Sequence, residues 1–438
     1  MTPPNQLFVF FVPSWLNNLL RAFAPLREKH FSAAFACLLV FASIVSAENW
    51  DRFRGPNGAG QSDDSGIPTT WEPNNFLWKQ PLDGVGHSSP VIWGDRLFLT
   101  WADTSTGAQV VAAFDVKTGH PLWQKKFESP KYHINDLNSF ASSTPALDKD
   151  HVYVMWLQER EIMLVALSHG GDEIWRSDVG PFKEQHGFGI SPIVVDDLVY
   201  VSHDSGAKSA ITAFDRNSGE VRWNLPCEAG TTAFDSPCLL DPNAKQKLLL
   251  STSTATGLNA VDAASGKIAW QGFKDELDQR CVSSPIVANG IIFVGCGQGG
   301  NGKLVLAVRP GDGSTPPQEL YRLQQNVPQV PTPVVAGDLL FVWSDRGIVS
   351  CYDIATGKKY WRERIGGDFH SSPIRIGNRI FGLSRQGEAV VLAADKEYKL
   401  LARNVLNEPC IATPAVANHC LYVRTESTLM CIGQADGS

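Results

Sequence analysis

Several polar side chains stand just upstream of Ser-Pro or Thr-Pro pairs, where their types could support chemistry. His87 and His370 occupy equivalent places, each three residues before such a proline. Imidazole can transfer protons near neutral pH and can bind metals. If the two imidazoles and a carboxylate faced one channel in the fold, they would form a ligand-binding, proton-transfer or metal site. The candidate site residues are His87, His186, Asp235, Arg280, Asp368 and His370.

The alternative for each of these side chains is structural, a hydrogen bond to a neighbouring loop. The sequence has no Gly-x-Ser-x-Gly elbow, no phosphate-binding loop and no His-Glu-x-x-His pair. It also has no Cys-x-x-Cys pair and no Cys/His cluster with the spacing of a metal site. We therefore predict no catalytic residue and no metal ligand.

The Ser/Thr-Pro pairs themselves form a repeat that must position these side chains. Each pair opens an apolar alternation, and the separations of about 40 to 55 residues are typical of radially repeated sheets. Each unit is expected to hold four strands, the innermost of which lines an axis, so the residues before each proline would rim one mouth of a funnel. The repeated prolines are Pro90, Pro145, Pro192, Pro237, Pro285, Pro333, Pro373 and Pro414.

A second repeat has the form Ala-x-Asp-x-x-Ser/Thr-Gly-x-x-x-Trp and recurs at the same period, with Cys351 replacing Ala in one copy. Its Asp can accept hydrogen bonds from the turn that follows, and its Gly supplies the positive φ of a bulged hairpin. Its Trp then lies on the returning strand, where the ring can cover a sheet face. The motif residues are Asp115, Gly119, Trp123, Asp215, Gly219, Trp223, Asp262, Gly266, Trp270, Asp353, Gly357 and Trp361.

The two ends of the repeat region complement each other. A Trp-bearing strand at 76–80 precedes the first Ser-Pro pair, whereas the last unit ends at 429–432 without such a strand. Pairing the two would remove the open seam that edge strands leave. The predicted fold is all-β, an eight-bladed β-propeller of four-stranded antiparallel blades over residues 72–438, closed by the N-terminal strand completing the last blade.

Composition excludes one class of partner. The 438 residues include 38 Lys and Arg against 45 Asp and Glu, giving a formal charge of −7 without any basic run. Nucleic-acid binders carry a concentrated positive face, so we expect no nucleic-acid partner.

Residues 1–47 are predicted to be a signal peptide. Arg27 and Lys29 precede the apolar run 31–45, and Val45-Ser46-Ala47 offers small residues for cleavage. A retained membrane anchor and a lipid anchor on Cys37 are the alternatives. We expect a secreted or periplasmic protein of the bacterial envelope, which would associate with a membrane only if it kept a signal or lipid anchor.

Residues 48–71 are punctuated by Gly and Pro and are expected to form an N-terminal arm packed across the propeller rim, with a binding loop as the alternative. After removal of the signal, eight cysteines remain. Disulfides in an oxidising compartment and isolated buried thiols are both compatible with this number.

The second repeat resembles the docking motif of the pyrroloquinoline quinone (PQQ) repeat propellers, over about residues 72–438. The opening Trp50-x-x-Phe-Arg-Gly-Pro-x-Gly-x-Gly60 is similar to the start of many secreted bacterial members. This resemblance implies one of two functions. One branch of the family comprises alcohol and sugar dehydrogenases that hold PQQ and Ca²⁺ on the axis; the other, similar to outer membrane protein assembly factor B, binds protein partners with its rim loops and holds no cofactor.

The chain departs from the dehydrogenase pattern in three ways. It lacks a vicinal Cys-Cys pair, it is shorter than those enzymes usually are, and its loops are too short for a deep lid over the funnel. The expected function is therefore a non-catalytic binding scaffold for a protein or another envelope ligand, monomeric and without a cofactor. The alternative is a PQQ- and Ca²⁺-dependent alcohol or sugar dehydrogenase that uses the face of His87, Asp235 and His370.

Overall fold

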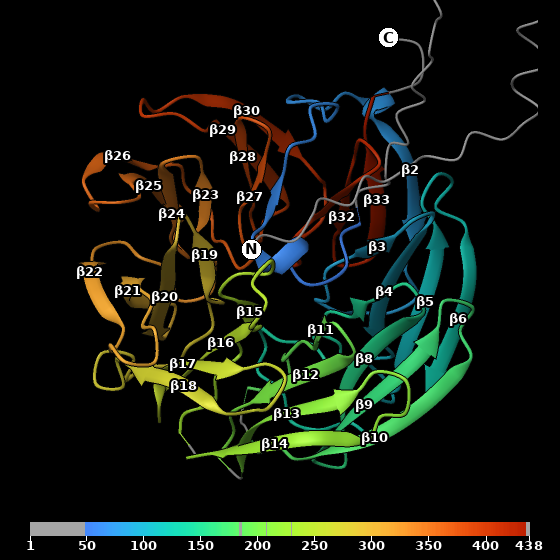
Figure 1. Ribbon diagram of the computed structural model, residues 1–438. Coiled ribbons are helices and arrows are strands. Elements are labelled where there is room, and N and C mark those ends of the chain that lie inside the picture. The colour runs from blue at the N-terminus through green and yellow to red at the C-terminus, as the bar shows by residue number, and fades with distance from the viewer. Residues whose placement is uncertain (1–48, 184–185, 207, 229, 435–438) are drawn as a thin grey trace, which may run out of the picture. The chain divides into compact units, whose positions relative to one another are not determined.

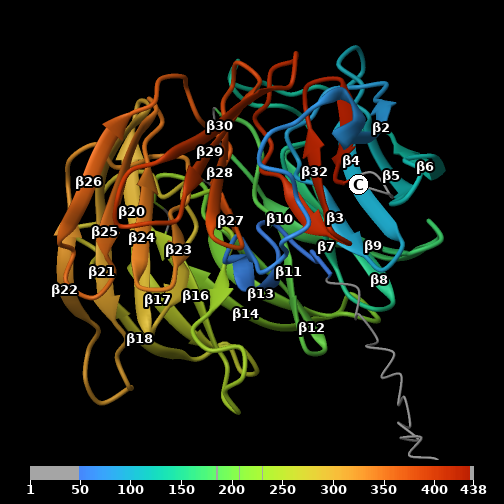
Figure 2. The same ribbon diagram turned by 90° about the horizontal axis from the view of Figure 1, so that it is seen from above.

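The computed structural model describes residues 49–183, 186–206, 208–228 and 230–434. The predicted signal peptide, 1–47, lies outside these residues. The described strands form eight sheets that stand around a ring, which is viewed along its axis in Figure 1 and from the side in Figure 2. All pairings within the four-stranded blades are antiparallel, so the predicted all-β, eight-bladed propeller is confirmed.

Each of the first four blades runs from a short innermost strand at the axis to an outermost strand that carries an aromatic residue. Blade 1 contains β3 (Val91–Trp93), β4 (Arg96–Ala102), β5 (Gln109–Asp115) and β6 (Pro121–Phe127). Blade 2 contains β7 (Ala146–Leu147), β8 (His151–Gln158), β9 (Glu161–Ser168) and β10 (Glu173–Pro181). Blade 3 contains β11 (Ile193–Val195), β12 (Leu198–His203), β13 (Ser209–Asp215) and β14 (Val221–Cys227). Blade 4 contains β15 (Cys238–Leu239), β16 (Leu248–Ser253), β17 (Gly257–Asp262) and β18 (Ile268–Gly272).

The remaining blades repeat this order, and the last one takes its outermost strand from the beginning of the repeat region. Blade 5 contains β19 (Ile286–Ala288), β20 (Ile291–Gln298), β21 (Asn301–Arg309) and β22 (Gln318–Leu323). Blade 6 contains β23 (Val334–Ala336), β24 (Leu339–Trp343), β25 (Ile348–Asp353) and β26 (Lys359–Arg364). Blade 7 contains β27 (Ile374–Ile376), β28 (Arg379–Leu383), β29 (Glu388–Ala393) and β30 (Leu400–Val405). Blade 8 contains β31 (Ala415–Ala417), β32 (Cys420–Arg424), β33 (Thr428–Ile432) and β2 (Phe76–Pro81).

The ring closes in blade 8, as predicted. Strand β2 pairs antiparallel with β33, and Trp78 lies opposite Cys431. The 3-10 turn η2 (Pro73–Asn75) leads into β2, and the Asn75 side chain donates to the carbonyl of Gly433 at 3.1 Å. The N-terminal strand of the repeat region therefore occupies the edge that blade 8 would otherwise leave open.

The repeated turn has the geometry that its residue types require. Asp115 Oδ1 accepts hydrogen bonds from the backbone N–H groups of Lys117 and Thr118, at 3.1 and 2.8 Å. Gly119 has φ 70°, and the register between β5 and β6 shifts at the bulge beside Ala113. The Asp thus satisfies backbone donors that the tight turn leaves unpaired.

At five of the blade junctions, the aromatic residue of the outermost strand packs against a turn glycine of the next blade. Trp78 Nε1 donates to the carbonyl of Val116 at 3.0 Å, and a Cβ added to Gly119 would lie 2.4 Å from the Trp78 ring. The same ring-on-glycine contact joins Trp123 to Gly171, Trp175 to Gly219, Trp223 to Gly266, and Tyr321 to Gly357. A glycine is needed at these turns because the neighbouring ring fills the space of a side chain.

The core lies between the blades. Apolar side chains of adjacent sheets interdigitate, as Phe98 of β4 does with Val154 and Trp156 of β8. The eight cysteines of the described chain are free thiols, and most are buried in these layers. Free thiols, one of the two alternatives from sequence, are therefore what this structure contains, and the side chains of Cys420 and Cys431 interact with each other.

The described part of the arm lies across the axis, whereas the sequence predicted packing on the rim. Figures 1 and 2 both place this blue segment beside β27. It contains the 3-10 turn η1 (Pro56–Gly58) and β1 (Gln61–Ser62), which pairs in parallel with β27. Trp50 is completely buried and bridges to Ile92 of β3, and Asn57 exchanges two hydrogen bonds with the backbone of Leu239 of β15. The arm thus touches the innermost strands of blades on opposite sides of the ring.

Arg54 is the main anchor of the arm. Its guanidinium is buried and donates to the carbonyls of Pro333 and Pro373, both at 2.9 Å. It also donates to Gly58 and Ala59 within the arm, at 3.1 and 3.2 Å. The side chain is therefore satisfied entirely by backbone oxygens, as a buried guanidinium requires.

No helix in the described part of the chain is long and apolar enough to cross a bilayer.

Candidate functional site

A cavity of about 430 Å³ lies on the propeller axis, and we call it the axial cavity. Its wall includes the Ser or Thr of six Ser/Thr-Pro pairs, one from each of six blades, so it is bounded by the beginnings of the innermost strands. These residues are Ser89, Thr144, Ser191, Ser236, Thr332 and Thr413.

These hydroxyl residues are linked around the axis by hydrogen bonds from blade to blade. The backbone N–H of Ser89 donates to Thr144 Oγ1 at 3.0 Å, and the N–H of Thr144 donates to Ser191 Oγ at 3.0 Å. Equivalent bonds of 2.9 to 3.0 Å run from Ser236 to Ser284, Ser284 to Thr332, Thr332 to Ser372, and Ser372 to Thr413. The Ser/Thr-Pro repeat therefore builds a rigid collar around the axial cavity.

The arm and one long loop complete the cavity. Phe53 of the arm contributes to the lining, beside the anchor Arg54. Asn135, Leu137 and Asn138 line it from the connection between β6 and β7. The sequence predicted loops too short for a deep lid; this connection nevertheless supplies part of the cavity wall.

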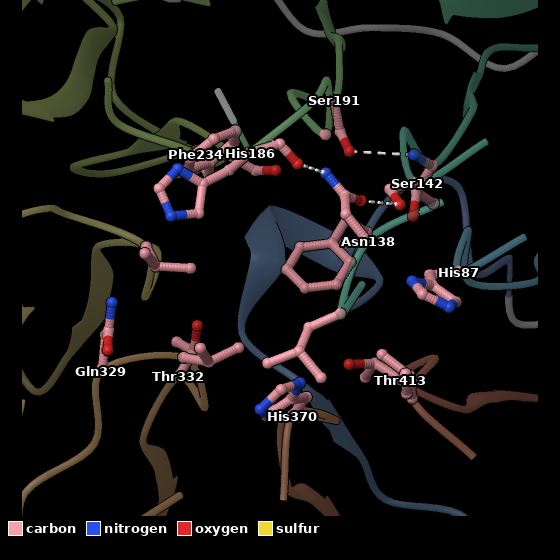
Figure 3. Close-up of a pocket in the computed structure, with 18 of the residues that line it drawn as sticks. His87, Asn138, Ser142, His186, Ser191, Phe234, Gln329, Thr332, His370 and Thr413 are labelled. Carbon is pink, nitrogen blue, oxygen red and sulfur yellow. Dashed lines mark hydrogen bonds between the residues drawn. The ribbon is translucent and has the colours of Figure 1, made fainter. Parts of the chain in front are cut away.

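The long connection is held to the next one by side-chain hydrogen bonds. Asn138 Nδ2 donates to the carbonyl of His186 at 2.7 Å, and the N–H of Asn135 donates to the same carbonyl at 3.3 Å. Asn138 Oδ1 accepts from Ser142, another lining residue (Figure 3). The amide of Asn138 thus fixes two neighbouring loops at one side of the cavity.

Four of the six candidate residues from the sequence line the axial cavity: His87, His186, Arg280 and His370. Figure 3 shows the three histidines on different sides of it. The other two candidates, Asp235 and Asp368, are not part of the lining.

Asp235 and Asp368 have structural partners instead. Asp235 is buried, and its Oδ2 accepts a hydrogen bond from the N–H of Thr252 at 3.0 Å. Burial raises the pKa of Asp235 to about 7. Asp368 Oδ2 accepts from Gln386 Nε2 at 3.1 Å. The carboxylate that the sequence placed beside the imidazoles is therefore absent from this cavity wall.

Burial and nearby arginines act on two of the histidines, His87 and His370. Burial lowers the pKa of His87 to about 3, and Arg424, His370 and Arg385 add to the effect. Burial also lowers the pKa of His370 to about 4; Arg385 acts in the same direction, and Asp368 acts against it. Both rings are neutral at physiological pH, so each offers one N–H donor and one acceptor nitrogen.

Arg280 brings a permanent positive charge to the wall. Its guanidinium carbon lies 5.6 Å from the centre of the Phe234 ring, a cation–π arrangement. Its Nη1 donates to the carbonyl of Thr232 at 3.4 Å. Phe234 also lines the cavity, so charge and aromatic surface adjoin here.

The donor set does not fit the Ca²⁺ that accompanies PQQ in the dehydrogenase branch. Ca²⁺ takes six to eight oxygen ligands, usually with carboxylates among them. No Asp or Glu occurs among the described residues that line the cavity. Across the described ranges, no group of three or more His, Cys, Asp or Glu side chains is arranged to hold a metal ion.

Sequence reasoning missed three parts of this site: the hydroxyl collar, Phe53 of the arm, and Asn138. The collar could have been predicted from the sequence, because its members are the Ser and Thr of the repeated Ser/Thr-Pro pairs. No sequence pattern indicated Phe53. Its position in the cavity wall depends on the hydrogen bonds from the neighbouring Arg54 to Pro333 and Pro373, which lie about 280 and 320 positions away in the chain.

Curated relatives match this chain at low identity. Outer membrane protein assembly factor BamB of Burkholderia pseudomallei is 24% identical over 91% of this chain and 96% of its own length. The factor of the same name from Moranella endobia is 24% identical over 46% of this chain, which spans about half, 54%, of that relative.

Solved structures support the fold alone. The crystal structure of BamB from Moraxella catarrhalis has a TM-score of 0.58 at 16% identity and covers 83% of this chain and 98% of its own. A europium-containing methanol dehydrogenase has a TM-score of 0.67 at 12% identity and covers 88% of this chain and 98% of its own. BamB and the methanol dehydrogenase therefore share this ring of blades, and the fold alone does not distinguish a dehydrogenase function from a BamB-like one.

The family comparison is more decisive than these pairwise matches. The family described as outer membrane protein assembly factor BamB matches residues 69–168, 160–319 and 322–402, which is more than half of the chain. These segments carry the turn and tryptophan repeat that joins the blades. The chain therefore belongs to the PQQ-repeat propeller family that is described as outer membrane protein assembly factor BamB.

Proposed function

We propose that this chain is a non-catalytic scaffold of the bacterial envelope, secreted or periplasmic, that binds a protein partner through the loops at the mouth of the axial cavity. Membership of the BamB-like family supports the class of function. The observation that carries the non-catalytic part is the composition of the cavity wall. Its described residues include no carboxylate to bind Ca²⁺ or to act as a base.

The connection between β6 and β7 is the contact region that this proposal favours. Leu137 belongs to it, lines the cavity and is 46% exposed, so a large apolar side chain is available to a partner at the cavity. The loop is held in place through Asn138, so it presents Leu137 on a rigid support. Rigid apolar anchors of this kind dominate the binding energy of protein interfaces.

Site-specific photo-crosslinking in the bacterium of origin tests the proposal. A photoreactive residue in place of Leu137 should give one defined adduct with an envelope protein. The same residue in place of Lys358, exposed in the turn between β25 and β26, is the control and should give none. Absence of a specific adduct at Leu137, combined with saturable Ca²⁺-dependent binding of PQQ to the purified protein, would contradict the scaffold and support the dehydrogenase.

A further inference from the structure

We infer that Cys420 and Cys431 form an oxidisable thiol pair, a modification site at which a disulfide oxidant links the last two strands of blade 8. The bond would fix the strand on which the ring closes. Neither cysteine lines the axial cavity, so this site goes beyond the binding role proposed above. Its chemistry can be tested on the purified protein, whatever the binding partner is.

The pairing of β32 with β33 places both thiols on one face of blade 8. In this antiparallel pair Tyr422 lies opposite Cys431. Side chains two positions apart on a strand point to the same face, so Cys420 shares this face and is the diagonal neighbour of Cys431. The two side chains interact, and a Cβ added to Gly433 would lie 2.9 Å from Cys420 Sγ. The sulfur of Cys420 therefore lies beside the end of β33, in space that the glycine leaves open.

The thiol pair belongs to the blade that closes the ring. Strand β33 lies between β32 and β2 (Figure 1), and Trp78 of β2 is opposite Cys431. Trp78 also packs against Tyr422, with ring centroids 6.0 Å apart. A bond between Cys420 and Cys431 would hold β33 to β32, and β33 is the strand with which β2 pairs.

The two thiols differ in the way that an attacking and a resolving thiol differ. Cys420 is partly exposed, whereas Cys431 is buried. The contact with Cys431 lowers the pKa of the Cys420 thiol, and the same contact raises the pKa of Cys431. Tyr422 and His419 add to the lower pKa of Cys420, whereas burial and the Asp64 carboxylate oppose it. The thiolate is the nucleophile in disulfide exchange, so Cys420 should react first with an external disulfide.

The reaction needs an oxidant that is itself a disulfide. The Cys420 thiolate attacks one sulfur of that disulfide, forms a mixed disulfide and releases the other sulfur as a thiol. Cys431 then loses its proton and attacks Cys420 Sγ, which releases the second thiol of the oxidant. The protein gives up two protons and two electrons, and these reduce the oxidant's disulfide to two thiols.

Buried thiols elsewhere in the chain provide internal controls. Cys281 and Cys296 also lie near each other, but both are completely buried. Their Sγ atoms donate to backbone carbonyls, at 3.6 and 3.7 Å. Cys410 is buried as well, and its Sγ donates to the carbonyl of Arg424 at 3.2 Å. An external disulfide should therefore oxidise these thiols more slowly than Cys420.

Oxidised glutathione, a small disulfide, tests the inference on the purified protein. The reduced protein is incubated with it under native conditions, alkylated and digested with trypsin without reduction. The tryptic peptide 404–424, which contains Cys410 and Cys420, should be joined to the peptide that begins at Thr425 and contains Cys431. Dithiothreitol should separate the two peptides. No joined peptide, or a bond only between Cys281 and Cys296, would overturn the inference.

Three substitutions identify the reacting thiols. Cys420→Ser should abolish the joined peptide, whereas Cys410→Ser, which changes the other thiol of the same peptide, should leave it unchanged. Cys431→Ala should stop the reaction at the mixed disulfide, with one glutathione on Cys420. A joined peptide that persists in Cys420→Ser, or that disappears in Cys410→Ser, would assign the bond to Cys410.

Urea unfolding tests whether the bond fixes the closing strand. The oxidised wild-type protein should have a higher unfolding midpoint than the same protein in dithiothreitol, because a cross-link between β32 and β33 restricts the unfolded chain. Cys420→Ser should unfold at one midpoint under both conditions. Equal midpoints for the oxidised and reduced wild-type protein would show that the bond does not strengthen the closure.

Discussion

At the scale of single residues, five of the blade junctions each combine one aromatic ring with one glycine. Trp223 shows the arrangement: its ring covers Gly266 of the next blade, and its Nε1 donates to the carbonyl of Ala263 at 3.0 Å. A glycine is required at this position for two reasons: its φ is positive, and the Trp223 ring occupies the space that a side chain would need. Two substitutions separate these requirements.

Gly266→Ala should destabilise the protein more than Gly290→Ala. Both glycines have nearly the same φ, 71° and 73°, so both variants carry the left-handed penalty of about 1–2 kcal/mol. A Cβ at 266 would lie 2.6 Å from the Trp223 ring, whereas nothing lies within 4 Å of one at 290. The clash should add roughly 1–3 kcal/mol, measured by urea unfolding. Equal losses would show that the ring contact is not needed.

Asp235 predicts a stability that falls as the pH rises. Its carboxyl has a pKa of about 7 in the folded protein, raised from 3.8 by burial. Between about pH 4 and 7 the unfolded chain has lost this proton and the folded chain keeps it, so each step upward in pH favours unfolding. The loss across this window is on the order of 4 kcal/mol.

Asp235→Asn should abolish this part of the pH dependence, because an amide stays neutral and its oxygen can still accept from Thr252 N–H. The measurement is the midpoint of urea unfolding between pH 4 and 8. Asp136→Asn, the same change on an exposed loop residue, is the control and should leave the slope intact. A slope that survives in Asp235→Asn would assign it to another group, such as Asp204, a buried carboxylate whose charge acts on Asp235.

At the scale of elements, the arm is a structural member of the propeller. Arg54 joins it to the loops that lead into blades 6 and 7, through the carbonyls of Pro333 and Pro373. Arg54→Met should cost about 3 kcal/mol or more, since it removes the donor to four carbonyls, two in the loops and two in the arm, and each buried carbonyl left unsatisfied costs roughly 1–3 kcal/mol. Arg309→Met on the surface serves for comparison. Urea unfolding and limited proteolysis near Gly60 measure the effect, and wild-type behaviour of both would contradict it.

The blades could be predicted from sequence because their determinants are local. Asp115, Gly119 and Trp123 lie within nine positions, and the turn they build is satisfied by its own backbone. The site could be predicted only in part. His87, Arg280 and His370 were found from their places before the repeated prolines, but Asp235 occupies the same kind of place and turns instead to Thr252. Which way a loop side chain turns depends on neighbours from another strand, and spacing does not encode that.

At the scale of the whole molecule, the ring is closed by the same ring-on-glycine contact that joins four other pairs of neighbouring blades. Trp78 in β2 ties blade 8 to blade 1 through Val116, and Trp175 in β10 ties blade 2 to blade 3 through Arg216, with hydrogen bonds of 3.0 and 2.9 Å. The two rings are 9% and 8% exposed. The closure should therefore be as strong as an internal junction.

Trp78→Ala and Trp175→Ala should each cost about 3–5 kcal/mol, with similar unfolding midpoints in urea. Circular dichroism and tryptophan fluorescence should report coincident transitions in both variants. A much larger loss in Trp78→Ala, or transitions that separate only there, would mean that blade 8 is a weak seam.

The pairing of β2 with β33 also sets an order of events during synthesis. Strand β2 leaves the ribosome among the first parts of the repeat region, yet its partner β33 follows about 350 residues later. At an elongation rate of about 5–20 residues per second, β2 waits for roughly 20 to 70 seconds with its edge unpaired. The first blade strand to be made is thus paired last, and for that time its protection must come from outside its own blade.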